Sequence, residues 1–212
     1  MTDDARYPVP ASTHRTVEEI RRSRFVTTVE RVATIEEADA FVKRVSAEFA
    51  DATHNCYAFV VGPPGSTGRV GMSDAGEPHG TAGRPMLTVL LHSGIGDVAA
   101  VVTRYYGGTK LGTGGLVRAY SACVQHALAE LPLGERVVLV PLIVAVEYAS
   151  ASAVSHLFAT HEVEVVEERY AEDVTYDLRL PRGRLEGFRE AVLDATRGRA
   201  RLTGGDPVPD PG

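Results

Sequence analysis

Hydrophobic and polar positions repeat with two different periods along the chain, and the change of period predicts alternating strands and helices. Strands are predicted where β-branched or continuous apolar side chains run together, at residues 23–32, 54–62 and 97–106. The last of these is so uniformly apolar that we expect it in the middle of a sheet. The first half of the chain is therefore predicted to contain a sheet with helices packed on it.

Helical spacing appears between these strands. After a capping box formed by Thr34 and Glu37, apolar side chains recur at helical spacing over residues 35–49. Residues 86–94 are predicted to be a short helix. A third predicted helix is amphipathic. Its apolar side is formed by Leu116, Tyr120, Cys123 and Ala127, and its polar side by Arg118, Ser121 and Gln125. We expect the first domain to cover residues 21–131.

The order of elements changes after Pro132, which stops the third helix. Residues 131–136 are predicted to be a short linker. Beyond it we predict strands at about 137–148, 162–170, 173–180 and 199–203, and helices at about 150–160 and 183–197. This β-α-β-β-α-β order is typical of ferredoxin-like domains, so a second domain is expected over residues 137–204. Residues 1–20 are predicted to be a flexible segment, and 205–212 a disordered tail.

Composition excludes several classes of protein. The 212 residues are 44% hydrophobic and 24% charged, as in soluble globular proteins. No apolar run approaches the roughly 18–20 residues of a membrane span, and the N-terminus has acids where a signal peptide needs positive charge. The two cysteines are too few for a disulfide scaffold and indicate reduced thiols. We therefore expect a cytoplasmic protein with no membrane partner.

The net charge of −6 is unevenly distributed. Residues 131–212 carry 9 Lys and Arg against 14 Asp and Glu, whereas residues 1–130 carry 13 against 14. Between Asp97 and Glu130 there is no acid at all. This balance argues against tight nucleic-acid binding over the whole surface, but it is compatible with a local basic patch.

That patch coincides with a glycine-rich stretch, RYYGGTKLGTGG at residues 104–115, between a predicted buried strand and a helix. At a helix start, free N–H groups and the helix dipole favour an anion, and glycine lets the anion approach the backbone. The spacing matches neither a P-loop nor G-x-G-x-x-G. We expect the three cations of this region to converge on one phosphate-binding surface, and the residues predicted to form it are Arg104, Tyr105, Gly107, Gly108, Lys110, Gly112, Gly114, Gly115 and Arg118. The alternative is that the glycines only permit a tight strand-to-helix crossing.

The stretch VVTRYYGGTKLGTGGLVRAYS closely resembles the signature of the YigZ/Impact family. RRSRFVTTVERV, HNCYAFVVG and SDAGEPHGTAGRP resemble further motifs of that family, so the resemblance covers roughly residues 20–125. Tyr106 stands where many relatives have phenylalanine, which keeps the aromatic ring.

The resemblance implies an α+β fold. Its N-terminal domain would be like the second domain of ribosomal protein S5, and its ferredoxin-like C-terminal domain like domain V of the translocation elongation factor. Family members have no established reaction. A eukaryotic relative is tied to translational control, and the bacterial relatives are thought to bind nucleic acid or the ribosome.

The loop GEPHGTAGRP, residues 76–85, is the second candidate constellation. Its polar residues Glu77, His79, Thr81 and Arg84 stand among glycines and prolines, as in rigid functional loops. We expect this loop to pack against the glycine run and to share its surface.

Two chemical alternatives involve the strand that precedes this loop. His54, Asn55 and Cys56 could join the loop in a zinc site, although the spacing matches no standard ligand pattern. Cys56 could also be a thiol nucleophile with His54 or His79 as its base. Cys123 is expected to be buried packing.

Two classes of function follow. The leading hypothesis is a non-enzymatic binding protein linked to translation, without cofactor, metal or catalytic residues. It would contact RNA, the ribosome or a translation-control protein through residues 77–84 and 104–118. The alternative is an enzyme acting on a small phosphorylated ligand or nucleotide, by fold-level analogy with kinases of the galactokinase type. Asp74 or Glu77 would then have to hold Mg²⁺. The sequence does not predict the oligomeric state.

Overall fold

The structure, a computed structural model, describes residues 6–205. The chain divides into two compact units. The N-terminal unit is Tyr7–Arg136, and the described part of the C-terminal unit is residues 137–205 together with Arg6. Both units mix helices and strands, so the predicted α+β class is confirmed. Within residues 6–205, no helix is both long and apolar enough to cross a membrane.

The N-terminal unit is built on a five-stranded antiparallel sheet. Its strands lie in the order β2 (His14–Ile20), β3 (Ser23–Arg31), β6 (Val98–Tyr105), β4 (His54–Val60) and β5 (Val70–Ser73). β6 is central, as predicted, because its apolar side chains are buried on both faces of the sheet.

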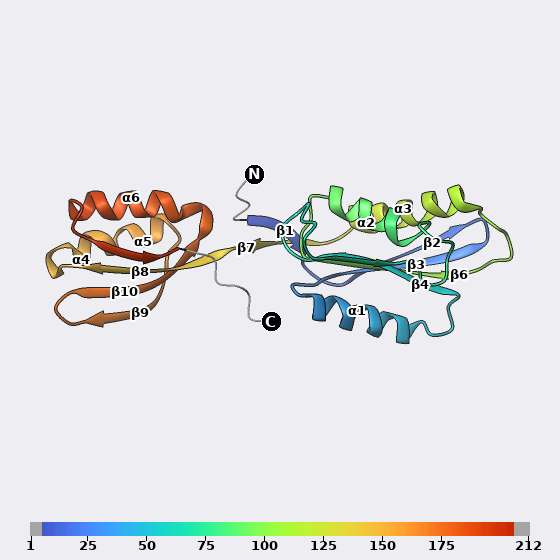
Figure 1. Ribbon diagram of the computed structural model, residues 1–212, viewed down its shortest axis with the longest axis horizontal. Coiled ribbons are helices and arrows are strands. Elements are labelled where there is room, and N and C mark those ends of the chain that lie inside the picture. Colours follow the sequence, from blue (N-terminus) through green and yellow to red (C-terminus); the bar gives the residue numbers. More distant parts are fainter. Residues whose placement is uncertain (1–5, 206–212) are drawn as a thin grey trace. The chain divides into compact units, whose positions relative to one another are not determined.

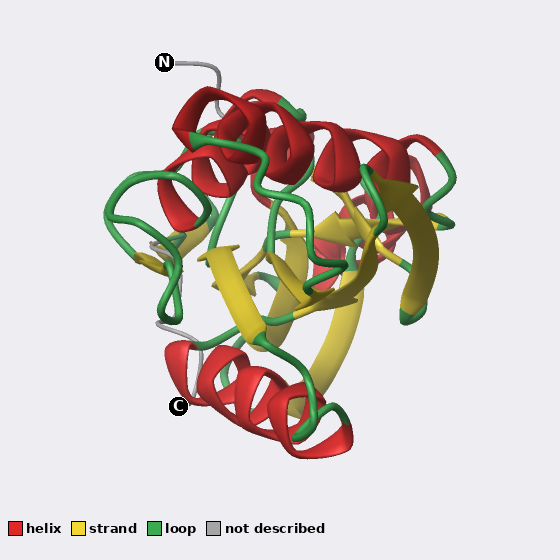
Figure 2. Cartoon of the chain, turned by 90° about the vertical axis from the view of Figure 1, so that its right-hand side faces the viewer, coloured by secondary structure: helices red, strands yellow, loops and turns green. Residues whose placement is uncertain are grey.

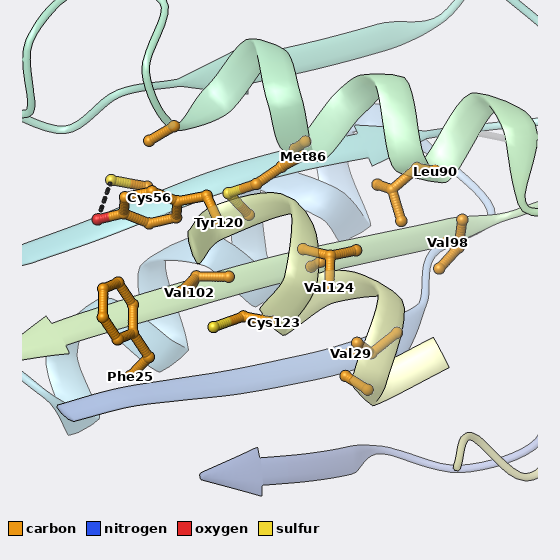
Figure 3. Packing of buried hydrophobic residues seen from close by; sticks show 14 of the residues in the cluster. Phe25, Val29, Cys56, Met86, Leu90, Val98, Val102, Tyr120, Cys123 and Val124 are labelled. Carbon is orange, nitrogen blue, oxygen red and sulfur yellow. Dashed lines mark hydrogen bonds between the residues drawn. The ribbon is translucent and has the colours of Figure 1, made fainter. Parts of the chain in front are cut away.

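Helices cover both faces of this sheet (Figures 1 and 2). On one face, α1 (Ile35–Glu48) packs Phe41 and Val45 into one hydrophobic cluster. The predicted N-cap is present, since Thr34 Oγ1 accepts a hydrogen bond from the Glu37 N–H at 3.1 Å. The Glu37 carboxylate closes the cap on the N–H of Ala33, one residue before the N-cap, at 2.7 Å. The other face is covered by α2 (Gly83–His92) and α3 (Thr113–Ala129), which bury the largest cluster of the unit (Figure 3).

Two predictions about the chain outside these elements are wrong. Residues 6–20 are not flexible: they form β1 (Arg6–Pro10) and the edge strand β2. The predicted linker contains β7 (Leu133–Val137), which pairs with β1 in a two-stranded ribbon. The strands form because Tyr7 and Val9 are buried and β2 gains a complete ladder with β3. Residues 1–5 and 206–212 of the predicted flexible ends lie outside the described residues.

The C-terminal unit has the predicted β-α-β-β-α-β order. Its elements are β8 (Leu139–Val146), α4 (Tyr148–Ser155), α5 (Leu157–Thr160), β9 (Glu164–Tyr170), β10 (Val174–Pro181), a 3₁₀ turn (Arg182–Arg184), α6 (Leu185–Thr196) and β11 (Arg201–Gly204). The strands lie antiparallel in the order β11-β8-β10-β9, with the helices on one face (Figure 1). Every second side chain of β8 from Val140 to Val146 is buried, which sets the face that the helices cover.

Candidate binding surface around the glycine run

A buried ion pair joins the loop before α2 to the central strand. Arg104 on β6 is 4% exposed, and its Nη1 lies 2.6 Å from Glu77 Oε1. The Tyr120 hydroxyl of α3 donates to the same carboxylate oxygen at 2.8 Å. Arg104 Nη2 also donates to Ser23 Oγ at 3.2 Å. One carboxylate therefore ties three elements together, and the expected packing of the loop against the region of the glycine run is observed.

The prediction that Arg104 lies on an exposed basic surface is wrong. In the β3–β6 register Arg104 lies opposite Phe25, and its guanidinium is 5.5 Å from that ring. It is also 5.5 Å from the ring of Tyr106. Removing one partner of a buried ion pair leaves the other charge uncompensated. Arg104 and Glu77 therefore stabilise the candidate surface from its buried side, and they are not free to bind a ligand.

Asp74 fixes the path of the same loop. Its Oδ1 accepts hydrogen bonds from the N–H groups of Ala82 (3.0 Å) and Gly83 (2.8 Å), and its Oδ2 from Gly80 (2.7 Å). Desolvation acts to raise the pKa of Asp74, but these hydrogen bonds outweigh it, and the pKa is lowered. A side chain at Gly83 would place its Cβ 2.9 Å from the backbone of Ser73. Asp74 thus supplies an internal anion at the start of α2.

The glycines of the run are needed for different structural reasons. A Cβ at Gly107 would lie 1.8 Å from the carbonyl oxygen of Arg22, so only glycine fits. Gly108 and Gly112 have φ of 82° and 74°, in the left-handed region that favours glycine. A Cβ at Gly114 would meet nothing within 4 Å. The alternative interpretation, in which the glycines only permit a tight strand-to-helix crossing, therefore accounts for Gly107, Gly108 and Gly112. It gives no steric reason for Gly114.

The start of α3 lacks the internal anion found at α2. Its N-cap is Gly112, no side chain accepts a cap hydrogen bond there, and its first turn contains no acid. Lys110 and Arg118 are both exposed beside it. These two predicted cations lie on the surface, next to a helix start that the protein does not neutralise.

Three arginines that sequence reasoning missed adjoin the glycine run. Arg21 and Arg22 form the turn between β2 and β3, and Arg24 lies opposite Tyr105 in the β3–β6 register. All three arginines are exposed. The available signal was the basic run RRSR, which only the pairing of β3 with β6 places beside Gly107.

The turn formed by Arg21 and Arg22 is conformationally costly. Their φ values are 47° and 67°, the left-handed geometry that tight hairpin turns normally reserve for Asn and Gly. Each non-glycine residue held there costs on the order of 1–2 kcal/mol. The fold therefore keeps two arginines where other residues would be more stable.

The other predicted loop residues separate into exposed and structural ones. His79 and Arg84 are exposed. Thr81 is buried, and its hydroxyl donates to the Pro78 carbonyl at 2.6 Å, so it shapes the loop from inside. The hydroxyl of Tyr105 donates a hydrogen bond to Asp51 Oδ1 at 2.8 Å.

The two chemical alternatives gain no support from the geometry. Cys56 is buried, and its thiol lies 2.9 Å from the Asp74 carbonyl oxygen, which can accept its hydrogen. The same sulfur lies 3.3 Å from the Tyr120 hydroxyl oxygen (Figure 3). Desolvation raises the pKa of Cys56 to about 12, the opposite of what a thiolate nucleophile needs. His54 Nδ1 is 2.9 Å from the Ala75 carbonyl. Over residues 6–205, no cluster of three or more His, Cys, Asp or Glu residues could hold a metal. Cys123 is buried in the core, as predicted.

Comparisons with known proteins agree with the layout of the two units. A family model described as the Impact N-terminal domain matches residues 21–128, and a domain of unknown function, DUF1949, matches residues 144–199. The chain is 40% identical to IMPACT family member YigZ of Escherichia coli over 194 residues, which covers 92% of this chain and 95% of that protein.

Other relatives cover the chain to a similar extent. An IMPACT family member of Haemophilus influenzae is 37% identical, covering 92% of this chain and 95% of its own length, and YvyE of Bacillus subtilis is 34% identical, covering 88% and 85%. A solved structure titled as that of a hypothetical protein superimposes with a TM-score of 0.67 at 37% identity, over 97% of this chain and 98% of that one.

Proposed function

The chain belongs to the IMPACT family, and from that premise we propose that it is a non-enzymatic binding protein that holds RNA on its N-terminal unit and acts in translation. The contact surface would be formed by the β2–β3 turn, the glycine run and the start of α3. Its ligand groups would be the phosphates of a single strand.

The observation that carries this proposal is the strained arginine turn. Arg21 and Arg22 occupy left-handed backbone positions that Asn and Gly would fill at lower cost. Strain of this kind is concentrated at functional sites, where it is tolerated because the side chains are needed. The turn presents its cations directly beside Gly107, whose missing side chain lets the two segments approach.

The rest of the surface has the chemistry that single-stranded nucleic acid requires. Lys110 and Arg118 add exposed positive charge near the start of α3. Tyr106 is an exposed aromatic ring next to the buried Arg104. A basic track with an accessible ring can bind phosphates and stack a base without reading sequence. The buried Arg104–Glu77 pair makes this surface a rigid one.

The acids considered for Mg²⁺ are already engaged, which favours binding over phosphoryl transfer. Asp74 accepts three backbone hydrogen bonds, and Glu77 accepts from Arg104 and Tyr120. Incubation with nucleotides and Mg²⁺ tests the enzyme alternative directly. Thermal stabilisation together with hydrolysis would contradict the proposal.

The decisive experiment measures the affinity of the full chain for single-stranded RNA as a function of salt concentration. About four phosphate contacts, one each from Arg21, Arg22, Lys110 and Arg118, would give a log–log slope of roughly −3, and each lost contact flattens the slope by roughly 0.7. We expect that effect from Lys110→Ala and from Arg118→Ala. Lys43→Ala, an exposed lysine on α1 at the opposite face of the sheet, is the matched control.

The arginine turn provides a second and sharper variant. Replacing Arg21 by Asn and Arg22 by Gly should raise the free energy of unfolding by on the order of 1 kcal/mol, because it relieves the strain. The same double variant should weaken RNA binding. Binding that stays at the level of the Lys43→Ala control in all these variants would overturn the proposal.

A further inference from the structure

The outer edge of the C-terminal sheet carries an unusual strand. Within the described residues β9 pairs with β10 on one side only, and each of its seven residues is exposed. Edge strands offer unpaired N–H and C=O groups to other chains, and proteins commonly block them with lysine, proline or a covering segment. β9 has neither lysine nor proline. A register shift at Val166 interrupts the ladder, but Glu167–Tyr170 stay in regular pairing with β10.

Aromatic rings and a carboxylate meet at one end of this edge. Tyr170 and Glu168 lie opposite the buried Val174 and Tyr176, so both side chains are on the helical side of the sheet. Tyr148 at the start of α4 stacks on Tyr170, with ring centroids 6.4 Å apart. The two tyrosines are 54% and 65% exposed, and the Tyr170 hydroxyl donates to Glu168 at 2.6 Å. Stacked rings beside a carboxylate are suited to binding a lysine or arginine side chain.

The charge around the strand is predominantly negative, although Arg179 of β10 lies opposite Glu164. Glu164, Glu167 and Glu168 are exposed on β9, and Glu172 follows it. The one cation of β9, Arg169, is held by Asp177 and Glu167. Residues 131–212 as a whole carry an excess of five acids. An incoming strand must therefore bring positive charge.

We propose that the outer edge of β9 binds an extended, basic peptide segment of a partner protein, which adds to the sheet as a further strand. Main-chain hydrogen bonds to the edge would provide affinity, as in other strand additions. A lysine or arginine of the peptide would sit on Tyr148 and Tyr170, close to Glu168. This site lies in the C-terminal unit and is independent of the proposed RNA surface.

Charge selects this occupant over the alternatives. Pairing of two β9 strands from two copies would bring three glutamates and only one arginine from each strand into the same interface, and this excess of like charge disfavours the pairing. RNA phosphates would be repelled by the same carboxylates. A basic peptide meets neither obstacle.

The test uses the full-length chain and dye-labelled peptides. A short peptide of alternating lysine and valine should bind by fluorescence anisotropy, and the same peptide with glutamate in place of lysine should not. A lysine–valine peptide N-methylated on alternate residues keeps its charge but cannot form the ladder, so its affinity should fall by at least about tenfold. Hydrogen exchange should show new protection at residues 164–170 when the unmethylated peptide binds.

Single substitutions distinguish strand addition at β9 from nonspecific electrostatic attraction of the peptide to an acidic protein. Glu168→Lys should weaken binding by about tenfold or more, and Tyr170→Ala by several-fold, because each removes a contact to the cationic side chain. Glu190→Lys on α6 changes the net charge equally and should have little effect. Equal weakening by Glu190→Lys, equal binding of the methylated peptide, or protection that appears without peptide as the protein concentration rises would overturn the proposal.

Discussion

The two helices on the same face of the N-terminal sheet begin in opposite ways. At α2 the protein supplies its own anion, since Asp74 accepts three backbone N–H groups of the loop and first turn. At α3 the N-cap is a glycine, and the first turn holds no acid. The first helix start is therefore capped by a carboxylate of the protein, whereas the second has no acid of its own in its first turn. Glycines that look alike in the sequence serve different purposes at the two places.

The largest effect is expected from removing the Glu77 carboxylate, which links the loop before α2 to β6 and α3. Glu77→Ala leaves Arg104 buried without its partner and should lower the free energy of unfolding by about 3–5 kcal/mol. Chemical denaturation measures this loss. Glu48→Ala, which breaks the exposed pair with Arg15, should have little effect on the free energy of unfolding, because exposed ion pairs contribute little. Equal losses in the two variants would contradict the structural role given to Glu77.

The second largest loss of stability is expected from removing the charge of Asp74, the internal anion at the start of α2. Asp74→Asn keeps the shape of the side chain but loses the charge at the start of α2, at a cost on the order of 1–2 kcal/mol near neutral pH. Because the folded-state pKa of Asp74 is lowered, its stabilisation is present above the ordinary carboxyl pKa near 4 and disappears as the pH falls through the folded-state value. Unfolding curves across acidic pH should therefore converge for wild type and variant. Asp39→Asn on α1 is the control.

A matched pair of glycine substitutions sharpens the comparison. Gly83→Ala forces a Cβ to 2.9 Å from the Ser73 backbone and should destabilise by about 1–3 kcal/mol. Gly114→Ala meets open space on α3 and should stabilise by about 0.5–1 kcal/mol. If close approach of a ligand explains Gly114, the second variant should also bind RNA more weakly. A more stable variant with unchanged affinity would show that Gly114 is not part of the surface.

The smallest effect is expected at the far end of α3. The hydrogen bond to Glu18 raises the pKa of His126 against the opposing effect of desolvation, and the charges of Glu18 and Glu130 raise it further. A raised pKa means that this contact stabilises the fold below the ordinary histidine pKa near 6.5, and that the contribution is lost as the pH rises through the folded-state value. An NMR titration should locate the shift, and Glu18→Gln should reduce it.

Much of the fold could be predicted because its local signals agree. The alternating apolar positions of β8 and the N-cap of α1 each point to the element that forms. β1 and β2 could not be predicted in this way. β1 contains Pro8 and Pro10, and β2 exposes Val17 while burying Thr16, so their strand structure depends on pairing with β7 and β3.

The candidate surface shows the same limit. Lys110 and Arg118 were identified from their spacing around the glycine run. The burial of Arg104 was not predicted, because it depends on an ion pair with Glu77, which is distant in the sequence. The arginines of the β2–β3 turn were visible as a basic run, but only the strand register places them beside Gly107.

The strand order of the N-terminal sheet has a consequence for how the chain acquires its structure during synthesis. β6 lies between β3 and β4, although both precede it in the chain. The β2–β3 and β4–β5 hairpins can each form early, but their inner edges have no partner until residues 98–105 have left the ribosome. Unpaired inner edges are sites of faulty association, and long-range pairing of this kind is slow. Between translation of β4 and translation of β6, both of these inner edges therefore stay open on the nascent chain.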